Sequence, residues 1–203
     1  KMAEAYVYGE KPPKPETVTG TVSESSITVN VGNSSITVGV QLPTTGSAPY
    51  PAIVALWASM MGLDANLVRN EGVAIIDYDP YAVGSEAGSR ANKSGVFYDI
   101  YGSNSTTGLL VAWAWGVSRI IDVIEASGGD ILKADAIGVT GCSRFGKGAF
   151  TVGAFDQRIA LTIPFESGSG GVPIWRGIPG EGAQSPSSAY GETYWLGDAF
   201  GSF

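Results

Sequence analysis

The feature that most constrains this chain is a short apolar run that passes into a glycine-rich turn around a single serine. The run, residues 136–139, is typical of a buried strand. Ser143 comes next, preceded by Gly141 and followed by Gly146 and Gly148, before an apolar segment compatible with a helix. Small residues on both sides of a serine allow a strand to turn sharply into a helix, with the serine at a strained apex. The sequence therefore predicts a strand, a tight turn with an exposed hydroxyl, and a helix.

A serine held in this way can serve as a nucleophile. Backbone N–H groups and the N-terminus of the helix would lie beside its hydroxyl, where they stabilise negative charge that develops on a substrate oxygen. The general nucleophile motif is Gly-x-Ser-x-Gly, but here two residues separate Ser143 from Gly146. On this general pattern alone, a catalytic serine and an ordinary glycine-rich turn of an α/β protein are equally good interpretations.

Apolar patterns along the rest of the chain predict an α/β fold. Runs rich in β-forming residues, the last two with period-two alternation, occupy residues 17–22, 26–31 and 35–42. An all-apolar run at residues 52–57 is typical of a central strand buried on both faces, residues 73–77 are typical of a second buried strand, and residues 159–165 form another apolar strand. Segments compatible with helices occupy residues 63–69, 109–126 and 147–155. We expect a mostly parallel, twisted sheet covered by helices on both faces, with antiparallel strands at its start.

Two segments lack such patterns. Residues 1–16 are rich in Lys, Glu and Pro, and we expect them to form an exposed lead-in. Residues 78–106 show little periodicity, and a connection of that length is usually functional or stabilised by its own packing. Within the predicted helix 109–126, Trp113 and Trp115 are expected in the core rather than in a ligand site.

Composition narrows the class of protein. The chain has 203 residues, of which 44% are hydrophobic and 15% charged, so it is globular and large enough for one core and one domain. The net charge of −7 argues against nucleic acid or an anionic membrane surface as a partner. Residues 109–124 are interrupted by Arg119 and Asp122, so no membrane span is expected.

The residues around Ser143 also resemble the signature of a known family. Gly141-Cys142-Ser143-Arg144 followed by Gly146-Lys147-Gly148-Ala149 is similar to the motif of the glucuronoyl esterases, carbohydrate esterase family 15, which lengthen the turn in this way. The resemblance extends over residues 6–195. It implies an α/β-hydrolase three-layer sandwich and a serine esterase that cleaves esters of 4-O-methyl-D-glucuronic acid. Phe145 stands where fungal members are expected to carry Asn, which should alter the pocket rim more than the chemistry.

Three residues would carry the chemistry. Ser143 would attack the ester carbonyl and form an acyl-enzyme. Arg144 could be an ordinary surface cation, but a cation is poorly placed at a helix N-terminus, and stabilising an oxyanion would explain it. The resemblance implies that role. Glu166, at the end of the predicted strand 159–165, would by itself be interpreted as a solvated side chain, whereas the resemblance implies the acid of a catalytic triad.

Three further residues are candidates for binding the sugar. Lys147 lies one helical turn beyond Ser143 on the same helix face, and spacing alone favours a solvated lysine. Gln184 and Glu192 lie in a segment where spacing predicts nothing beyond solvated polar side chains. The resemblance implies that all three contact hydroxyl groups of the glucuronic acid ring.

Histidine is absent from the chain and cysteine occurs once. A serine nucleophile needs a base, usually histidine, and α/β-hydrolases place it after the serine and the acid. We therefore expect residues 1–203 to be a single, incomplete catalytic domain with its histidine beyond residue 203; a relative that lost activity is the alternative. Cys142 is either a buried small hydrophobe or half of a disulfide whose partner lies outside the chain. The resemblance implies the disulfide, to a cysteine beside the catalytic histidine.

The remaining expectations concern location, cofactors and substrate. Three Asn-x-Ser/Thr sequons, at Asn33, Asn92 and Asn104, in an acidic chain rich in Ser, Thr and Gly favour a secreted glycoprotein. Neither a metal nor an organic cofactor is expected, because ligands and phosphate-binding motifs are lacking. The resemblance implies glucuronoxylan as the substrate, including its ester links to lignin. Two alternatives remain: a secreted xylan esterase acting on acetyl or feruloyl groups, and a non-catalytic hydrolase-like binding domain.

Overall fold

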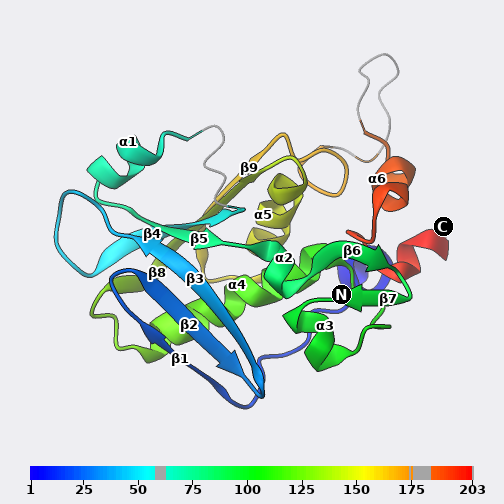
Figure 1. Cartoon of the computed structure of the whole chain (residues 1–203). Helices are drawn as coiled ribbons and strands as arrows, with labels where there is room; N and C mark the ends of the chain where they lie inside the picture. The colour runs from blue at the N-terminus through cyan, green and yellow to red at the C-terminus, as the bar shows by residue number, and fades with distance from the viewer. Residues whose placement is uncertain (58–62, 174, 176–183, 203) are drawn as a thin grey trace.

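The computed structural model describes residues 1–57, 63–173, 175 and 184–202, which form a layered α/β structure (Figure 1). A seven-stranded sheet has the order β1-β2-β3-β5-β4-β8-β9. Its strands are β1 Val18–Val22, β2 Ser26–Val31, β3 Ser34–Gln41, β4 Tyr50–Leu56, β5 Ala74–Tyr78, β8 Leu132–Cys142 and β9 Ile159–Phe165. The helices are α1 Ala65–Asn70, α2 Pro80–Val83, α3 Val96–Tyr101, α4 Leu109–Ala126, α5 Arg144–Phe155 and α6 Pro186–Glu192.

Strand directions confirm the predicted sheet. β1, β2 and β3 form an antiparallel meander, and β3 pairs antiparallel with β5. From β5 through β4 and β8 to β9 every pairing is parallel. The chain leaves β4 for β5 on one side and reaches β8 on the other, so the strand order reverses at β4. In open α/β sheets, binding sites form outside the carboxyl ends of the strands at such a reversal.

Helices cover both faces of the sheet, as predicted, but not equally. α4 and α5 pack on one face, over the large core, and every residue of α4 from Leu109 to Ile124 is buried. Trp113 and Trp115 are both fully buried, which confirms their assignment to the core. On the other face α1 packs over a smaller cluster formed by Ile53, Ala55 and Ile75. α1 is the single described helix over this second cluster, so the site-bearing helix α5 rests on the better-packed face.

The predicted lead-in is exposed over most of residues 1–16, but it is also fastened to the rest of the molecule, and Tyr8 and Gly9 are buried. A short π-helix, η1 Glu4–Tyr8, ends at a buried tyrosine whose hydroxyl donates to the Gly170 carbonyl, 3.1 Å away. Backbone N–H groups of Gly108 and Gly197 donate to carbonyls of Tyr8 and Val7. Backbone hydrogen bonds and a single aromatic ring fasten this segment, and neither produces an apolar periodicity in the sequence. Composition was therefore the only guide to its exposure.

Residues 78–106 contain α2, α3 and a two-stranded hairpin, β6 Ser85–Ser89 and β7 Asn92–Ser94. The hairpin is fastened to the end of the chain by Arg90, which donates to carbonyls of Tyr190, Thr193 and Leu196. Its guanidinium also stacks on the Tyr190 ring, 3.6 Å from the centroid. The β6–β7 hairpin therefore lies on one side of the region outside the strand ends, and Arg90 fixes residues 190–196 on the other side.

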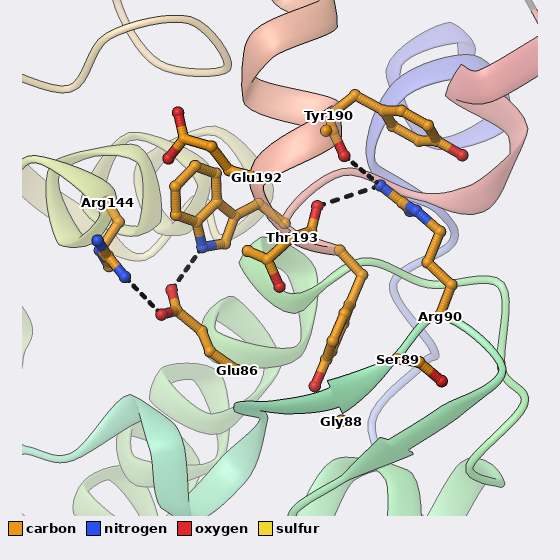
Figure 2. Close-up of a pocket in the computed structure, with 11 residues that line it drawn as sticks. Glu86, Gly88, Ser89, Arg90, Arg144, Tyr190, Glu192 and Thr193 are labelled. Carbon is orange, nitrogen blue, oxygen red and sulfur yellow. Dashed lines mark hydrogen bonds and ion pairs between the residues drawn. The ribbon is translucent and has the colours of Figure 1, made fainter.

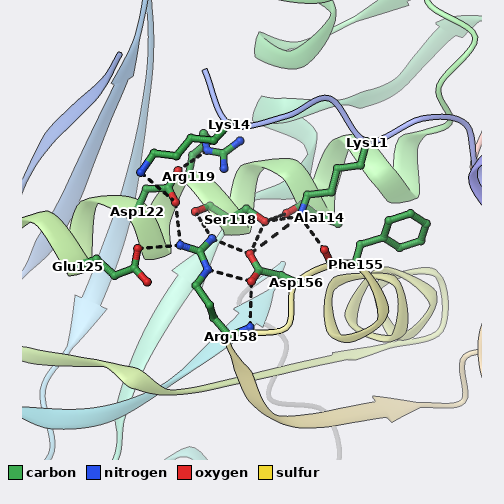
Figure 3. Close-up of polar contacts among 10 residues, drawn as sticks. All are labelled: Lys11, Lys14, Ala114, Ser118, Arg119, Asp122, Glu125, Phe155, Asp156 and Arg158. Atoms are coloured by element: carbon green, nitrogen blue, oxygen red, sulfur yellow. Dashed lines mark hydrogen bonds and ion pairs between the residues drawn. The ribbon is translucent and has the colours of Figure 1, made fainter. Parts of the chain in front are cut away.

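A buried polar network joins α4 to the turn between α5 and β9 (Figure 3). Arg158 donates to Asp156 from two nitrogens, at 2.7 and 2.9 Å, and to Asp122 and Glu125 at 2.8 and 2.9 Å. Asp156 also accepts from the Ser118 hydroxyl at 2.6 Å. Burial alone would raise the pKa of the Asp156 carboxyl, but hydrogen bonds from Arg158 and Ser118 outweigh it and hold that pKa well below its usual range.

Further cations reach the same network from the N-terminal segment and from α4. Lys11 donates to the Ser118 hydroxyl at 2.7 Å, and Lys14 lies 3.6 Å from Asp122. Arg119 donates to Asp122 at 2.6 Å. These contacts tie residues 11–14 to α4 and give a second reason why the lead-in is not free.

Among the described helices, none combines the length and apolarity that crossing a membrane requires.

Candidate active site

Ser143 occupies the apex of a tight turn between β8 and α5. β8 ends at Cys142 and α5 begins at Arg144, so one residue makes the connection. Its φ of 58° and ψ of −123° lie in a region that side-chain-bearing residues rarely adopt. The side chain is exposed, and the backbone N–H donates to the Phe165 carbonyl of β9 at 3.0 Å. The predicted strained apex is therefore present, and the helix starts three residues earlier than predicted.

The lengthened motif has a steric explanation. A Cβ at Gly141 would lie 2.4 Å from the Phe145 carbonyl oxygen, and a Cβ at Gly146 would lie 2.3 Å from the Phe165 carbonyl oxygen. Both distances are shorter than real Cβ contacts allow. The second glycine is needed where α5 passes over the end of β9, which is three residues after the serine and not two. Glycine is thus required at these two positions by the way the turn packs.

Strain at the apex leads to a stability prediction. Ser143→Gly is expected to have a free energy of unfolding about 1 kcal/mol higher than Ser143→Ala. Alanine keeps an unfavourable backbone conformation that costs about 1–3 kcal/mol, whereas glycine avoids it but gives up about 0.4–1 kcal/mol through a more flexible unfolded chain. Urea unfolding of the two variants measures the difference. A glycine variant less stable than the alanine variant would show that the turn is not strained.

Glu166 lies beside Ser143 at the carboxyl edge of the sheet. Cys142 and Phe165 are register partners on the parallel strands β8 and β9, so Ser143 and Glu166 are the next residue on each strand. Glu166 is exposed and has a positive φ of 43°. Two consecutive strands thus end in a residue of unusual backbone conformation with an exposed polar side chain. This placement is suitable for an acid that orients a base between the strands.

Lys147 is buried, at 4% exposure, so the interpretation as a solvated lysine is wrong. Its ammonium donates to the Ser167 carbonyl at 2.6 Å and to Gln184 Oε1 at 2.5 Å. Gln184 Nε2 donates in turn to Glu192 Oε1 at 2.5 Å, so these two side chains are not simply solvated either. The structure therefore brings the three candidate sugar-binding residues into one hydrogen-bonded row, from α5 to the end of α6.

The environment of Lys147 also changes its acidity. Burial strips water from the ammonium and lowers its pKa to about 8; the Glu192 carboxylate opposes this shift and the Arg144 guanidinium adds to it. Lys147 therefore carries a proton at neutral pH and can donate to a hydroxyl group, but it loses that proton under mildly alkaline conditions. Such a group suits a neutral, hydroxyl-bearing ligand.

Arg144 directs its guanidinium toward a residue that the sequence analysis missed. Nη1 donates to Glu86 Oε2 on β6 at 2.5 Å (Figure 2). Trp195, also missed, places its indole 5.4 Å from the Arg144 guanidinium carbon and 5.3 Å from the Lys147 ammonium. Glu86 lies in the aperiodic segment 78–106, and no motif distinguishes it. Glu86 contacts Arg144 only because the fold brings β6 close to the start of α5.

A pocket of about 510 Å³ opens between the β6–β7 hairpin and the segment that follows α6 (Figure 2). Its lining is mostly polar or charged and includes Glu86, Arg90, Arg144, Glu192 and Trp195. The volume and the polar lining suit a small, hydroxylated ligand better than an apolar one. Arg144, the residue after Ser143, and Glu192, the end of the Lys147–Gln184–Glu192 row, both line this pocket, so the pocket adjoins the turn and the row.

Cys142 is free and buried at the end of β8, directly before the serine. Its predicted disulfide would need a cysteine outside these 203 residues, and it stays a prediction. Within the ranges that the structure describes, no cluster of His, Cys, Asp and Glu side chains is arranged to hold a metal ion.

Comparisons with known proteins show which family and which solved structures this chain is similar to. Residues 26–203 match the profile of a family described as "Glucuronyl esterase, fungi". A protein of Hypocrea jecorina named 4-O-methyl-glucuronoyl methylesterase is 39% identical over all of this chain, and the match covers 45% of that protein. The chain thus spans about half the length of the curated relatives that it matches.

Solved structures of similar proteins share the fold. The glucuronoyl esterase catalytic domain from Hypocrea jecorina superimposes with a TM-score of 0.88 at 39% identity, covering 99% of this chain and 56% of that one. A mutant glucuronoyl esterase from Sporotrichum thermophile, determined with methyl 4-O-methyl-β-D-glucopyranuronate, gives a TM-score of 0.83 at 38% identity. Its match covers 99% of this chain and 56% of that one.

Proposed function

This chain belongs to the fungal glucuronoyl esterase family, and from that premise we propose that the protein carrying it is a serine-type carboxylic ester hydrolase acting on esters of 4-O-methyl-D-glucuronic acid. The observation that carries the proposal is one juxtaposition. An exposed serine at a strained turn lies one helical turn from a buried lysine, and that lysine is hydrogen-bonded in a row with Gln184 and Glu192.

In the proposed reaction Ser143 Oγ attacks the ester carbonyl carbon while a base takes its proton. The negative charge on the carbonyl oxygen is stabilised by backbone N–H groups at the start of α5 and by the Arg144 guanidinium. The alcohol leaves with the proton that the base returns, and water then hydrolyses the glucuronoyl-enzyme. Glu166 orients the base and stabilises its positive charge.

We propose that the base is a histidine supplied from outside these 203 residues, which contain none. Residues 1–203 would then be part of one catalytic domain, and Cys142 would pair with a cysteine near that histidine. Ser143 and Glu166 are both exposed and directly follow register partners on neighbouring strands, which supports a base that contacts both of them.

For the substrate, the buried lysine and the carboxamide–carboxylate pair provide donors and acceptors for the ring hydroxyls of a uronic acid. We propose glucuronoxylan, including its ester links to lignin, as the natural substrate. A secreted glycoprotein is consistent with this substrate, and Asn33, Asn92 and Asn104 of the three sequons are all exposed.

Lys147→Ala tests the substrate class. We expect kcat/KM for methyl 4-O-methyl-glucuronate to fall about 30-fold, because a charged hydrogen bond to a hydroxyl contributes about 2 kcal/mol. Hydrolysis of 4-nitrophenyl acetate, which has no ring hydroxyls, should change less than about threefold. Steady-state kinetics of the product of the complete gene, with the exposed Lys133→Ala on β8 as the matched control, measures both.

The outcomes of this experiment separate the proposed function from its alternatives. Equal losses on both esters would exclude a sugar-binding role for Lys147 and favour an acetyl or feruloyl esterase. A folded gene product without activity on any ester would favour the non-catalytic binding domain. Thermal melting of each variant confirms that changes in rate do not come from unfolding.

A further inference from the structure

We propose that Glu86 is a positioning residue of the esterase site, which holds the Arg144 guanidinium and the Trp195 indole in the arrangement that the reaction needs. The inference rests on the proposed function, because Arg144 is the group through which Glu86 would act. None of the sequence patterns assigns a role to Glu86, and its place emerges from contacts between three distant parts of the chain.

The Glu86 carboxylate is engaged through both of its oxygens (Figure 2). Oε2 accepts from Arg144 Nη1 at 2.5 Å and from the Tyr81 hydroxyl at 3.1 Å. Oε1 accepts from Trp195 Nε1 at 2.6 Å. The side chain is 18% exposed, so water competes only weakly for these bonds. Because each carboxylate oxygen accepts a hydrogen bond from a different side chain, the carboxylate has one preferred orientation.

Arg144 needs such an anchor. Its side chain is 41% exposed and begins at the N-terminus of α5, where the helix dipole repels a cation. The buried Lys147 lies one turn further on and adds a second positive charge. Without a carboxylate, the guanidinium would turn toward solvent. The ion pair with Glu86 keeps it beside the turn that carries Ser143, so its charge is already in place when negative charge develops on the ester.

The indole bond connects the two halves of the site. Trp195 is 3% exposed, and its ring lies close to both Arg144 and Lys147. By fixing the indole nitrogen, Glu86 also sets the position of a ring that lies near both Arg144, next to the serine, and Lys147, in the sugar-binding row. One carboxylate on the β6–β7 hairpin therefore aligns residues from α5 and from the segment after α6.

Glu86→Gln isolates the interaction with Arg144. A carboxamide has nearly the same shape, and its oxygen can still accept from the indole while its NH₂ group faces the guanidinium, to which it cannot act as an acceptor. We expect kcat on methyl 4-O-methyl-glucuronate to fall about 30-fold with KM changed less than about threefold, because a displacement of about 1 Å in a catalytic group can cost 100-fold. Glu24→Gln, in the exposed turn between β1 and β2, is the matched control.

A double-mutant cycle distinguishes positioning from a general structural role. In the Arg144→Ala background, Glu86→Gln should change kcat less than about twofold, because the group that it positions is gone. Equal losses in both backgrounds, or an unchanged kcat in Glu86→Gln, would overturn the inference. If the glutamine variant does not fold, Glu86→Asp replaces it in the same cycle with the same criterion. Ser143→Ala, measured in parallel, distinguishes a failure of the proposed function from a failure of the Glu86 inference. Activity retained in Ser143→Ala would refute the proposed function and not only the role of Glu86.

Discussion

Ser143→Ala is expected to lower kcat on methyl 4-O-methyl-glucuronate by about 10⁵-fold, because removal of a serine nucleophile leaves only binding and oxyanion stabilisation. The free energy of unfolding should change little, since the hydroxyl is exposed and alanine adopts the same backbone conformation at comparable cost. Steady-state kinetics on the product of the complete gene, at protein concentrations high enough to detect residual turnover, measures the effect.

The matched control for this experiment is Ser25→Ala, an exposed serine in the turn between β1 and β2, far along the sheet from β8. It should leave both kcat and KM unchanged. A loss of less than about tenfold in Ser143→Ala would show that this serine is not the nucleophile. The glycine-rich turn would then be a structural connection between β8 and α5 and nothing more.

Arg158→Met should cause the largest loss of stability among the substitutions considered, about 4 kcal/mol. Methionine fills a similar volume, but Asp122 and Asp156, at 3% and 6% exposure, each lose a charged partner. Breaking a buried ion pair from one side costs about 3–5 kcal/mol, because the remaining charge stays desolvated. Urea unfolding measures the loss. Lys14→Met is the control: this lysine is 55% exposed, and its contact with Asp122 should contribute less than about 1 kcal/mol.

The effect of Arg158→Met should depend on pH. In the wild-type protein the pKa of Asp156 is held well below its usual range, so its stabilising contribution is complete at neutral pH and disappears as pH falls toward that lowered pKa. The variant lacks the main group that lowers this pKa. The difference in unfolding free energy between the two proteins should therefore shrink as pH falls from 7 to 3. A constant difference over that range would mean that Arg158 acts through packing and not through charge.

Strong periodicity was enough to predict much of the fold. The limits of β2, α4 and β9 agree with residues 26–31, 109–126 and 159–165 as predicted. β2 buries one face and α4 nearly all of its side chains, whereas β9 is a half-exposed strand at the end of the sheet whose apolar run alone gave its limits. The turn at Ser143 was predicted for a related reason. A Cβ at Gly141 or Gly146 would meet a backbone oxygen only 4 or 19 residues away, so the requirement for glycine comes from nearby parts of the chain and is visible in the sequence.

The partners of the site residues could not be predicted, because they come from distant parts of the chain. Lys147 binds groups 20 and 37 residues away, so its position on a helix gave no indication that it is buried. Glu86 meets Arg144 across 58 residues and Trp195 across 109. No periodic pattern encodes contacts of this kind. The family resemblance named Lys147, Gln184 and Glu192, but only the folded arrangement shows that they form one row and that Glu86 lies beside it.

The N-terminal segment shows what composition leaves out. Its Lys, Glu and Pro content indicated exposure, and most of its residues are exposed, yet Tyr8 is buried and Lys11 donates to Ser118 in α4. A charged side chain can be partly buried where carboxylates and hydroxyls provide hydrogen-bond partners, and composition alone does not show that such partners are present.

The central claim, that this site cleaves esters of a uronic acid, is tested most directly by comparing two methyl esters. One is methyl 4-O-methyl-glucuronate, and the other is methyl tetrahydropyran-2-carboxylate, which has the same ring and ester but no hydroxyl groups. The product of the complete gene is predicted to hydrolyse the first with kcat/KM at least about 1,000-fold higher, because a site built to bind hydroxyls rejects a ligand without them. Equal rates on the two esters, or no hydrolysis of either by folded protein, would contradict the account.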